Sequence, residues 1–176
     1  SFRARDTSWP KMVAAVDSIL NHHSKEKGLL LCPSNKMLMY LAKKLSRVNS
    51  ARLILAYGEE RNERYNEHLK GSRPTVLAAS GFWEGVDLKD SASMFQVIPQ
   101  LPRPQWSGQI KARAEQDGSW YQWRTMCRLI QGLGRSVRSE TDTAISYVLD
   151  GDFRKEISKK NSIVPEWLRE AVSYVD

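Results

Sequence analysis

The chain has 176 residues, of which 41% are hydrophobic and 27% charged, values typical of one soluble globular domain with a core of its own. No run of about eighteen apolar residues is present and the N-terminus lacks the apolar segment of a signal peptide, so we expect no contact with a membrane and a cytoplasmic location. The net charge of +7 is compatible with a phosphate-bearing partner, either a nucleotide or a nucleic-acid backbone, or with a basic surface that only faces solvent.

Apolar runs and helical patterns alternate along the chain. Strands are predicted near Leu29–Cys32, Arg52–Ala56, Thr75–Ala79, Met94–Pro99 and Ala144–Leu149, and helices near residues 9–23, 35–46, 58–69, 119–135 and 164–174. Short strands that alternate with helices predict an α/β fold of three layers, in which helices cover both faces of a mostly parallel sheet. Ligands of such sheets gather at the carboxyl ends of the strands.

One segment interrupts the alternation. Residues 100–118 are rich in Pro, Gln, Gly and charge, which predicts a surface loop or insertion within a single domain spanning residues 1–176.

The cysteines and histidines indicate no metal site. Cys32 and Cys127 lie in apolar stretches, so we expect free thiols in a reducing compartment. His22, His23 and His68 lack partners at ligand spacing, and we expect the first two at a solvated helix end.

The segment "SGFWEGVDL", residues 80–88, follows the third predicted strand. Phe82 and Trp83 are candidates for core packing or for stacking on bases. Glu84 and Asp87, three residues apart, fit either a helix cap or an acid/base pair.

The segment "WYQWRTMCRLIQGLGRSVR", residues 120–138, reads as a helix with two faces. The side predicted to meet the core carries Trp123, Cys127, Ile130 and Val137, and a polar stripe carries Arg124, Arg128, Gln131, Arg135 and Arg138. Gly132 and Gly134 each destabilise a helix by about 1 kcal/mol relative to Ala, which indicates a close backbone approach or a helix break. Arginine suits contacts to phosphate oxygens, because its planar fork binds them in pairs.

Taken in order, these segments resemble a known family. "LLLCPSNKMLMYLAKKL", "GFWEGVDL", "QLPRP", "QGLGRSVR" and "TAISYVLDGDF" are similar to motif IV, motif V, the linking segment, motif VI and the following strand of the XPD/DinG group of superfamily 2 DNA helicases. The resemblance spans Leu29 to Phe153, and the segment with Trp106 resembles phage, prophage or archaeal versions.

The resemblance implies a RecA-like fold and the second motor domain of a helicase that hydrolyses ATP and moves 5′ to 3′ on single-stranded or forked DNA. ATP and Mg²⁺ would be held mainly by an N-terminal motor domain of the same protein, because a Walker A loop and an acidic Mg²⁺ box are missing from this sequence. An iron–sulfur cluster, if the protein carries one, is expected only in that missing part. The chain alone is expected to be inactive.

The resemblance also implies residue roles. Arg138 would be the arginine finger at the γ-phosphate, with Arg135 as a second contact. ATP binding and its coupling to DNA would involve Gln131, Gly134, Glu84, Asp87 and Gly85.

Four further residues are candidates for nucleic-acid binding: Ser34, Ser80, Arg124 and Arg128. Both serines could equally cap the helices that follow them. Trp106, Trp120 and Tyr121 flank the basic segment, where they could stack on bases or, for Trp120, lie buried under the helix.

Two alternatives stay open. A non-enzymatic nucleic-acid-binding module with a RecA-like shape fits the charge and the aromatics, but it does not require the arginine spacing near residue 135. An RNA helicase of the same superfamily is disfavoured by the FWEGVD form of motif V.

Overall fold

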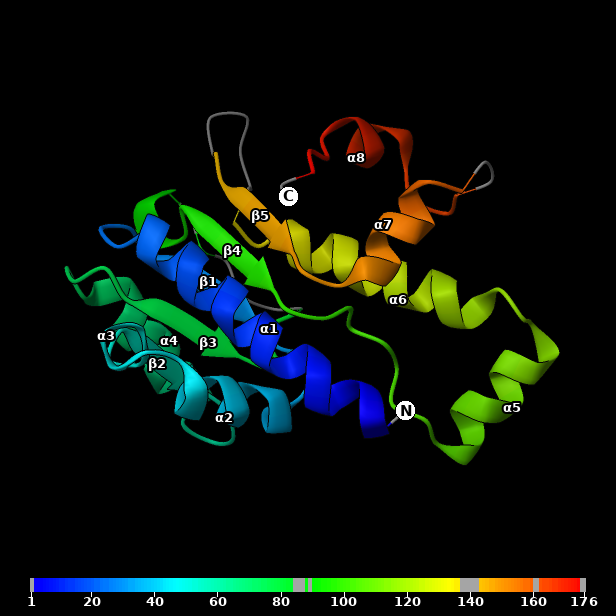
Figure 1. Cartoon of the computed structure of the whole chain (residues 1–176), viewed down its shortest axis with the longest axis horizontal. Helices are drawn as coiled ribbons and strands as arrows, with labels where there is room; N and C mark the ends of the chain where they lie inside the picture. The colour runs from blue at the N-terminus through cyan, green and yellow to red at the C-terminus, as the bar shows by residue number, and fades with distance from the viewer. Residues whose placement is uncertain (1, 84–87, 89, 137–142, 160–161, 175–176) are drawn as a thin grey trace.

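The computed structural model describes residues 2–83, 88, 90–136, 143–159 and 162–174. Five parallel strands form one sheet in the order β2-β3-β1-β4-β5 (Figure 1). The strands are β1 Gly28–Leu31, β2 Leu53–Ala56, β3 Val76–Ala79, β4 Phe95–Ile98 and β5 Ile145–Val148. All five lie where the alternation of the sequence predicts them, and the predicted α/β fold is confirmed.

Helices connect the strands on both sides of the sheet. They are α1 Phe2–His22, α2 Asn35–Lys44, α3 Arg47–Ser50, α4 Arg61–Lys70, α5 Gly108–Gln116, α6 Trp120–Leu133, α7 Gly151–Ile157 and α8 Glu166–Glu170, with a 3-10 turn η1 at Asp90–Ala92. None of the described helices is long and apolar enough to span a bilayer.

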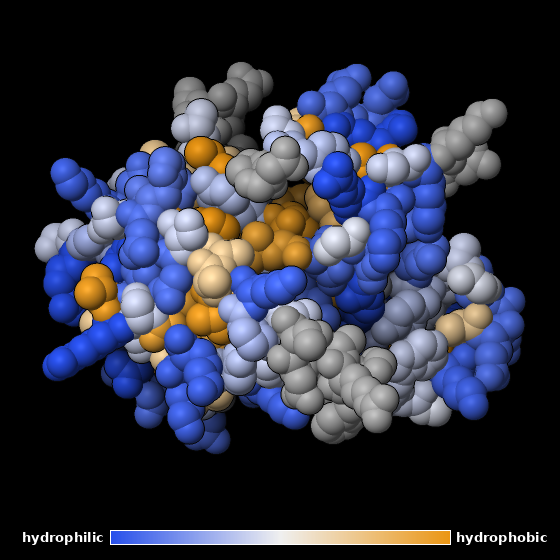
Figure 2. Space-filling view, viewed as in Figure 1, coloured by the Kyte–Doolittle hydropathy of each residue, from blue (hydrophilic) through white to orange (hydrophobic). Residues whose placement is uncertain are grey.

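The core has two halves because successive strand residues point to opposite faces of the sheet. Leu30, Ala78 and Val97 pack with Val16 and Leu20 of α1 and with α2 on one face. On the opposite face, the strand residues Leu29, Leu31 and Leu77 share a hydrophobic cluster with Leu129 of α6, Phe153 of α7 and Leu168 of α8. Figure 2 shows hydrophobic residues gathered at the middle of the face in view, with hydrophilic residues around them.

Three sequence predictions differ from the structure at the level of elements. The segment 100–118, predicted as a loop or insertion, contains α5, which begins where the Ser107 hydroxyl accepts a hydrogen bond from the Ile110 amide (3.3 Å). Helices α3 and α7 were not predicted; both are short, and Ser46 and Asp150 cap them. A short helix is fixed by its cap and its packing more than by its periodicity.

The prediction for His23 is wrong. Only 5% of its surface is exposed, its ring stacks on Phe95 with centroids 4.2 Å apart, and its Nε2 lies 2.9 Å from the Tyr147 hydroxyl. The chain enters β1 shortly after α1, and the Gly28 end of β1 pairs with Phe95 of β4, which places the ring beside that residue. Cys32 and Cys127 are free thiols, as predicted.

Candidate functional site at the carboxyl edge of the sheet

Phe82 and Trp83 anchor the segment that follows β3. They are 2% and 1% exposed, so both belong to the core, the first of the two alternatives. The Trp83 indole donates a hydrogen bond to the carbonyl of Cys32 (3.3 Å), the residue after β1. Phe82 makes an edge contact with Tyr65 of α4, with ring centroids 5.8 Å apart. These contacts fix the position at which the segment "GFWEGVDL" begins.

Helix α6 passes directly over Trp83 at Gly132. A Cβ atom at this position would lie 2.7 Å from Cε3 of Trp83, closer than a side chain tolerates, and 3.4 Å from Cδ1 of Leu31, an ordinary contact. Gly134 is different: a Cβ there would meet only carbonyl oxygens at 3.7 and 3.8 Å, and the residue ends the helix with φ of −73°. The close approach inferred from the two glycines therefore exists at Gly132 alone.

Arg135 joins the two motifs by a hydrogen bond. Its Nε donates to the carbonyl oxygen of Trp83 (3.1 Å), a residue 52 positions earlier, and its side chain is half-buried. Together with the Gly132 contact, this bond brings "GFW" and "QGLGR" into one junction at the carboxyl end of β3. We call Trp83, Gly132 and Arg135 the motif junction.

The other predicted site residues divide into two groups. Gln131 and Gly134 are exposed at the C-terminal end of α6, beside the motif junction. Glu84, Gly85, Asp87 and Arg138, like Val137, lie outside the described residues.

The predicted faces of α6 are rotated relative to the observed ones. The residues buried against the sheet are Thr125, Met126, Leu129 and Gly132, whereas Trp123, predicted to lie in the core, is 51% exposed. Figure 1 shows that α6 begins beyond the tip of β4, toward α5. Trp123, in the first turn of α6, lies outside the core, whereas Met126 in the next turn is 5% exposed and packs in the core.

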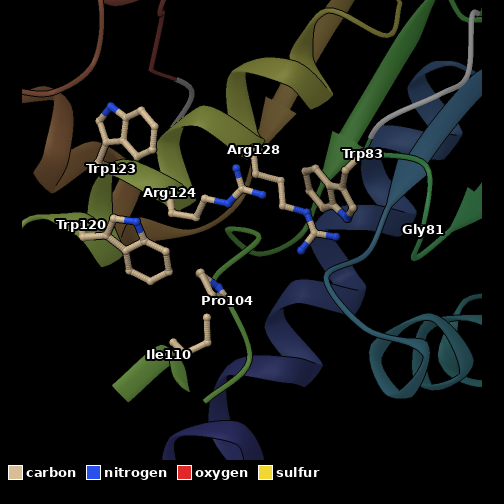
Figure 3. Close-up of a pocket in the computed structure, with 8 residues that line it drawn as sticks. All are labelled: Gly81, Trp83, Pro104, Ile110, Trp120, Trp123, Arg124 and Arg128. Atoms are coloured by element: carbon tan, nitrogen blue, oxygen red, sulfur yellow. The ribbon is translucent and has the colours of Figure 1, made fainter. Parts of the chain in front are cut away.

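Arg124 and Arg128 lie one turn apart on α6. They line an open cavity of about 670 Å³ (Figure 3), together with Gly81, Trp83, Pro104, Ile110, Trp120 and Trp123. The guanidinium of Arg128 lies 5.7 Å from the ring centroid of Trp83, within the range of a cation–π contact. We call these eight residues the tryptophan–arginine groove. Trp120 is half-buried and lines the groove, so it is not fully buried under the helix, and its stacking on bases stays a prediction.

Ser34 and Ser80 lie at the same edge of the sheet. The Ser34 hydroxyl caps α2 by accepting a hydrogen bond from the Met37 amide (3.3 Å), and Ser80 donates to the side-chain oxygen of Asn35. For Ser34 the capping alternative is therefore observed.

The "QLPRP" segment is tied to the start of α7 by charge. Arg103 contacts Asp150 (2.9 Å) and Asp152 (2.6 Å), and the Leu101 amide donates to Asp150 (3.0 Å). Hydrogen bonding to Lys155, aided by Arg103, lowers the pKa of Asp152. The sequence spacing does not predict these contacts, although the segments "QLPRP" and "TAISYVLDGDF" both belong to the family resemblance.

Comparison with known families assigns the chain. A family model described as the helicase C-terminal domain matches residues 18–171. The chain belongs to this family. The match covers the sheet, α6 and the motif junction.

The relatives that match this helicase C-terminal domain are longer than the chain. It is 25% identical over 136 residues to the ATP-dependent DNA helicase YoaA of Haemophilus influenzae, a match covering 72% of this chain and 21% of that protein. It is similar to the structure of S. tokodaii Xpd4 (TM-score 0.67, 19% identity, 95% of this chain, 35% of that one). A structure titled XPD helicase gives a TM-score of 0.63 at 16% identity, covering 83% of this chain and 28% of that one. The chain thus spans about a fifth to a third of these relatives, and the solved structures confirm the RecA-like fold.

Proposed function

We propose that this chain is the second motor domain of an ATP-dependent DNA helicase, supplying motif V at residues 80–88 and motif VI at residues 131–138. The observation that carries the proposal is the motif junction. Arg135 donates to the Trp83 carbonyl (3.1 Å), and a Cβ at residue 132 would lie 2.7 Å from the Trp83 ring, so glycine allows the end of α6 to pack this closely. A nucleic-acid-binding module without an ATP cycle has no need for such a junction.

We infer that the junction couples motif VI to motif V. Because the Arg135 guanidinium holds the Trp83 carbonyl, a shift of the end of α6 must move the start of motif V. Charge that develops on a transferring phosphoryl group is stabilised best by positively charged groups already held in position. Arg135 and Gln131 would orient this end of the site, and Arg138 would reach the γ-phosphate.

The described residues suit the phosphates of ATP better than they suit Mg²⁺. Guanidinium and amide groups beside the motif junction suit phosphate oxygens, and bound ATP supplies the phosphoryl group that is transferred. Within the described residues, no cluster of three carboxylate, histidine or cysteine side chains could hold a metal ion. We therefore infer that Mg²⁺ and most of the nucleotide are held by an N-terminal motor domain, with single-stranded or forked DNA as the substrate and 5′ to 3′ movement.

The test is DNA-stimulated ATP hydrolysis by the full-length protein that contains this domain. We expect Arg138→Ala to slow turnover by at least about a hundredfold while DNA affinity changes little, and the 176-residue chain alone to be inactive. Normal turnover by the Arg138→Ala protein would refute the arginine-finger role. A full-length protein that binds DNA but hydrolyses no ATP would favour the binding-module alternative.

A further inference from the structure

The edge of the sheet formed by β2 is open. β2 lies at one end of the described sheet and pairs with β3 alone. The Val76 amide donates to the Arg52 carbonyl (2.9 Å), so the main-chain groups of every second residue from Arg52 onward point to β3. The N–H and C=O groups of Leu53 and Leu55 therefore point away from the sheet, where a further strand can bind them.

The sequence of β2 does little to prevent such pairing. Native proteins protect exposed sheet edges with Lys or Pro residues, or by keeping the edge strand short. β2 is short, but its sequence LILA contains neither Lys nor Pro. The exposed Tyr57 follows it, and Gly58, with φ of 65°, lies in the connection to α4. The edge thus presents main-chain donors and acceptors beside apolar side chains.

A groove of about 580 Å³ lies along this edge. It is lined by residues 53–55 of β2, by Tyr57 and Glu59 of the connection, and by a stripe of side chains along α4: Glu60, Arg64 and Glu67. The members of this stripe are spaced by four and three residues, so they share one face of the helix. We call this site the acidic edge groove.

The charge of the acidic edge groove is opposite to that of the chain as a whole. Its lining residues carry three carboxylates and one guanidinium, whereas the chain has a net charge of +7. Arg64 lies 3.3 Å from Glu60 and 3.0 Å from Glu67, whose side chains remain 67% and 47% exposed. The groove therefore attracts a basic ligand and repels the phosphates of a nucleic acid.

The two faces of β2 determine the sequence pattern that an added strand needs. Ile54 packs on the side of the sheet that α4 covers, and Leu53 and Leu55 pack on the opposite side. The side chains of an added strand alternate between the same two sides. Those on the α4 side would meet Glu60 and Glu67, and those on the other side would extend the apolar surface of β2. The acidic edge groove thus suits alternating basic and apolar residues.

We propose that the acidic edge groove binds an extended basic segment of a partner protein, which adds a strand beside β2. Its main chain pairs with Leu53 and Leu55, and its basic side chains contact the carboxylates of α4. A second copy of this chain is disfavoured as the occupant, because two β2 edges paired with each other would bring two acidic grooves together. The site uses none of the residues of the motif junction, so the inference goes beyond the motor function and does not depend on it.

The test measures binding of a fluorescent peptide of alternating Lys and Val, about ten residues long, to the full-length protein that contains this domain. The peptide should bind, and a peptide of alternating Glu and Val should not. The double substitution Glu60→Gln and Glu67→Gln is expected to weaken binding about three- to tenfold, because each exposed ion pair contributes up to about fivefold. Equal binding by the double variant and the unaltered protein would refute the role of the groove.

A matched control removes the same charges from other surfaces. Glu115 of α5 and Glu170 of α8 are exposed, and Glu115→Gln with Glu170→Gln should leave binding of the peptide nearly unchanged. Circular dichroism of both double variants checks that the protein is folded. Equal weakening by the two pairs of substitutions would show that only the overall charge attracts the peptide, and this would overturn the proposal.

Hydrogen exchange distinguishes strand addition from attraction between charges. Bound peptide should slow the exchange of the Leu53 and Leu55 amides, measured by mass spectrometry on the proteolytic fragment that contains β2. A peptide that binds without slowing exchange in this fragment would refute strand addition. Peptides N-methylated at every Lys or at every Val add a second measurement: the set whose amides face β2 should abolish binding, and equally tight binding of both would also refute the pairing.

Two more results concern the occupant. If the 176-residue chain binds the peptide but the full-length protein does not, another part of the same protein fills the groove and the proposal fails. If the peptide binds only by dissociating a dimer of the full-length protein, a second copy is the occupant and the proposal fails as well. Binding by the full-length monomer, with slower exchange at β2, supports it.

Discussion

At the scale of single residues, Gly132 and Gly134 look alike in the sequence and differ in the structure. A Cβ at residue 132 would press on Trp83, which is buried and hydrogen-bonded and cannot move aside, whereas a Cβ at residue 134 would have room. Glycine at both positions lowers helix stability, yet only one of them is required by packing. A substitution at each position should therefore act in opposite directions.

We expect Gly132→Ala to lower the free energy of unfolding by up to about 2 kcal/mol, because overpacking destabilises by about 1–3 kcal/mol and the gain in helix propensity offsets about 1 kcal/mol of it. Gly134→Ala should raise the same quantity by about 0.4–1 kcal/mol, since its φ of −73° suits alanine. Urea denaturation of both variants measures the difference. Equal effects of the two substitutions would contradict the role assigned to the Trp83 contact.

At the scale of elements, sequence periodicity located the strands but misplaced the faces of α6. Strands such as β1 and β3 are buried along their whole length, so an apolar run is enough to identify them. The faces of α6 depend on where the sheet ends beneath the helix, and an apolar pattern does not contain that information. For the same reason the exposure of Trp123, and with it the tryptophan–arginine groove, could not be predicted.

The element contacts of Arg103 lead to a second stability prediction. Arg103→Ala should lower the free energy of unfolding by about 1–2 kcal/mol, because the Asp150 side chain, 11% exposed, loses its charged partner. Arg64→Ala is the matched control: Arg64 also bridges two carboxylates, but its side chain is 44% exposed, so the loss should be much smaller because solvent screens the pair. Thermal or urea unfolding compares the two. Similar losses would show that the tie between "QLPRP" and α7 contributes no more than a surface pair.

At the scale of the whole molecule, the sequence motifs were sufficient to predict the α/β fold and the helicase resemblance. The motif junction itself could not be foreseen, because it depends on a tertiary contact between residues 83 and 135. His68, set aside in the sequence, also has a part in stability. It is fully buried, its Nε2 donates to the Ala92 carbonyl (2.8 Å), and its Nδ1 accepts from the Thr75 hydroxyl (2.9 Å).

This environment makes the fold sensitive to acid. Burial lowers the pKa of His68 below its ordinary value of 6.5, so the unfolded chain takes up the proton first. The contribution of His68 is fully present above about pH 6.5 and is lost as the pH falls from there through the folded pKa. We expect the free energy of unfolding, measured in urea, to fall between about pH 7.5 and about pH 5. His68→Gln should be less stable at the higher pH and show a smaller fall; an unchanged fall would assign the acid sensitivity to other groups.

The strand order has a consequence for how the molecule assembles. β2 and β3 are neighbours in the sheet and are separated in sequence only by α4. Central β1 pairs with β3 and β4, which both follow it at longer sequence separation, and β4 pairs with β5, the last strand in the chain. Loop-closure entropy therefore favours the β2–α4–β3 unit as the nucleus, and slow non-local pairings follow it. The motif junction requires β1, β3 and α6 to be in place together. We therefore expect the contacts of Trp83 with Gly132 and Arg135 to form later in folding than the β2–β3 pairing.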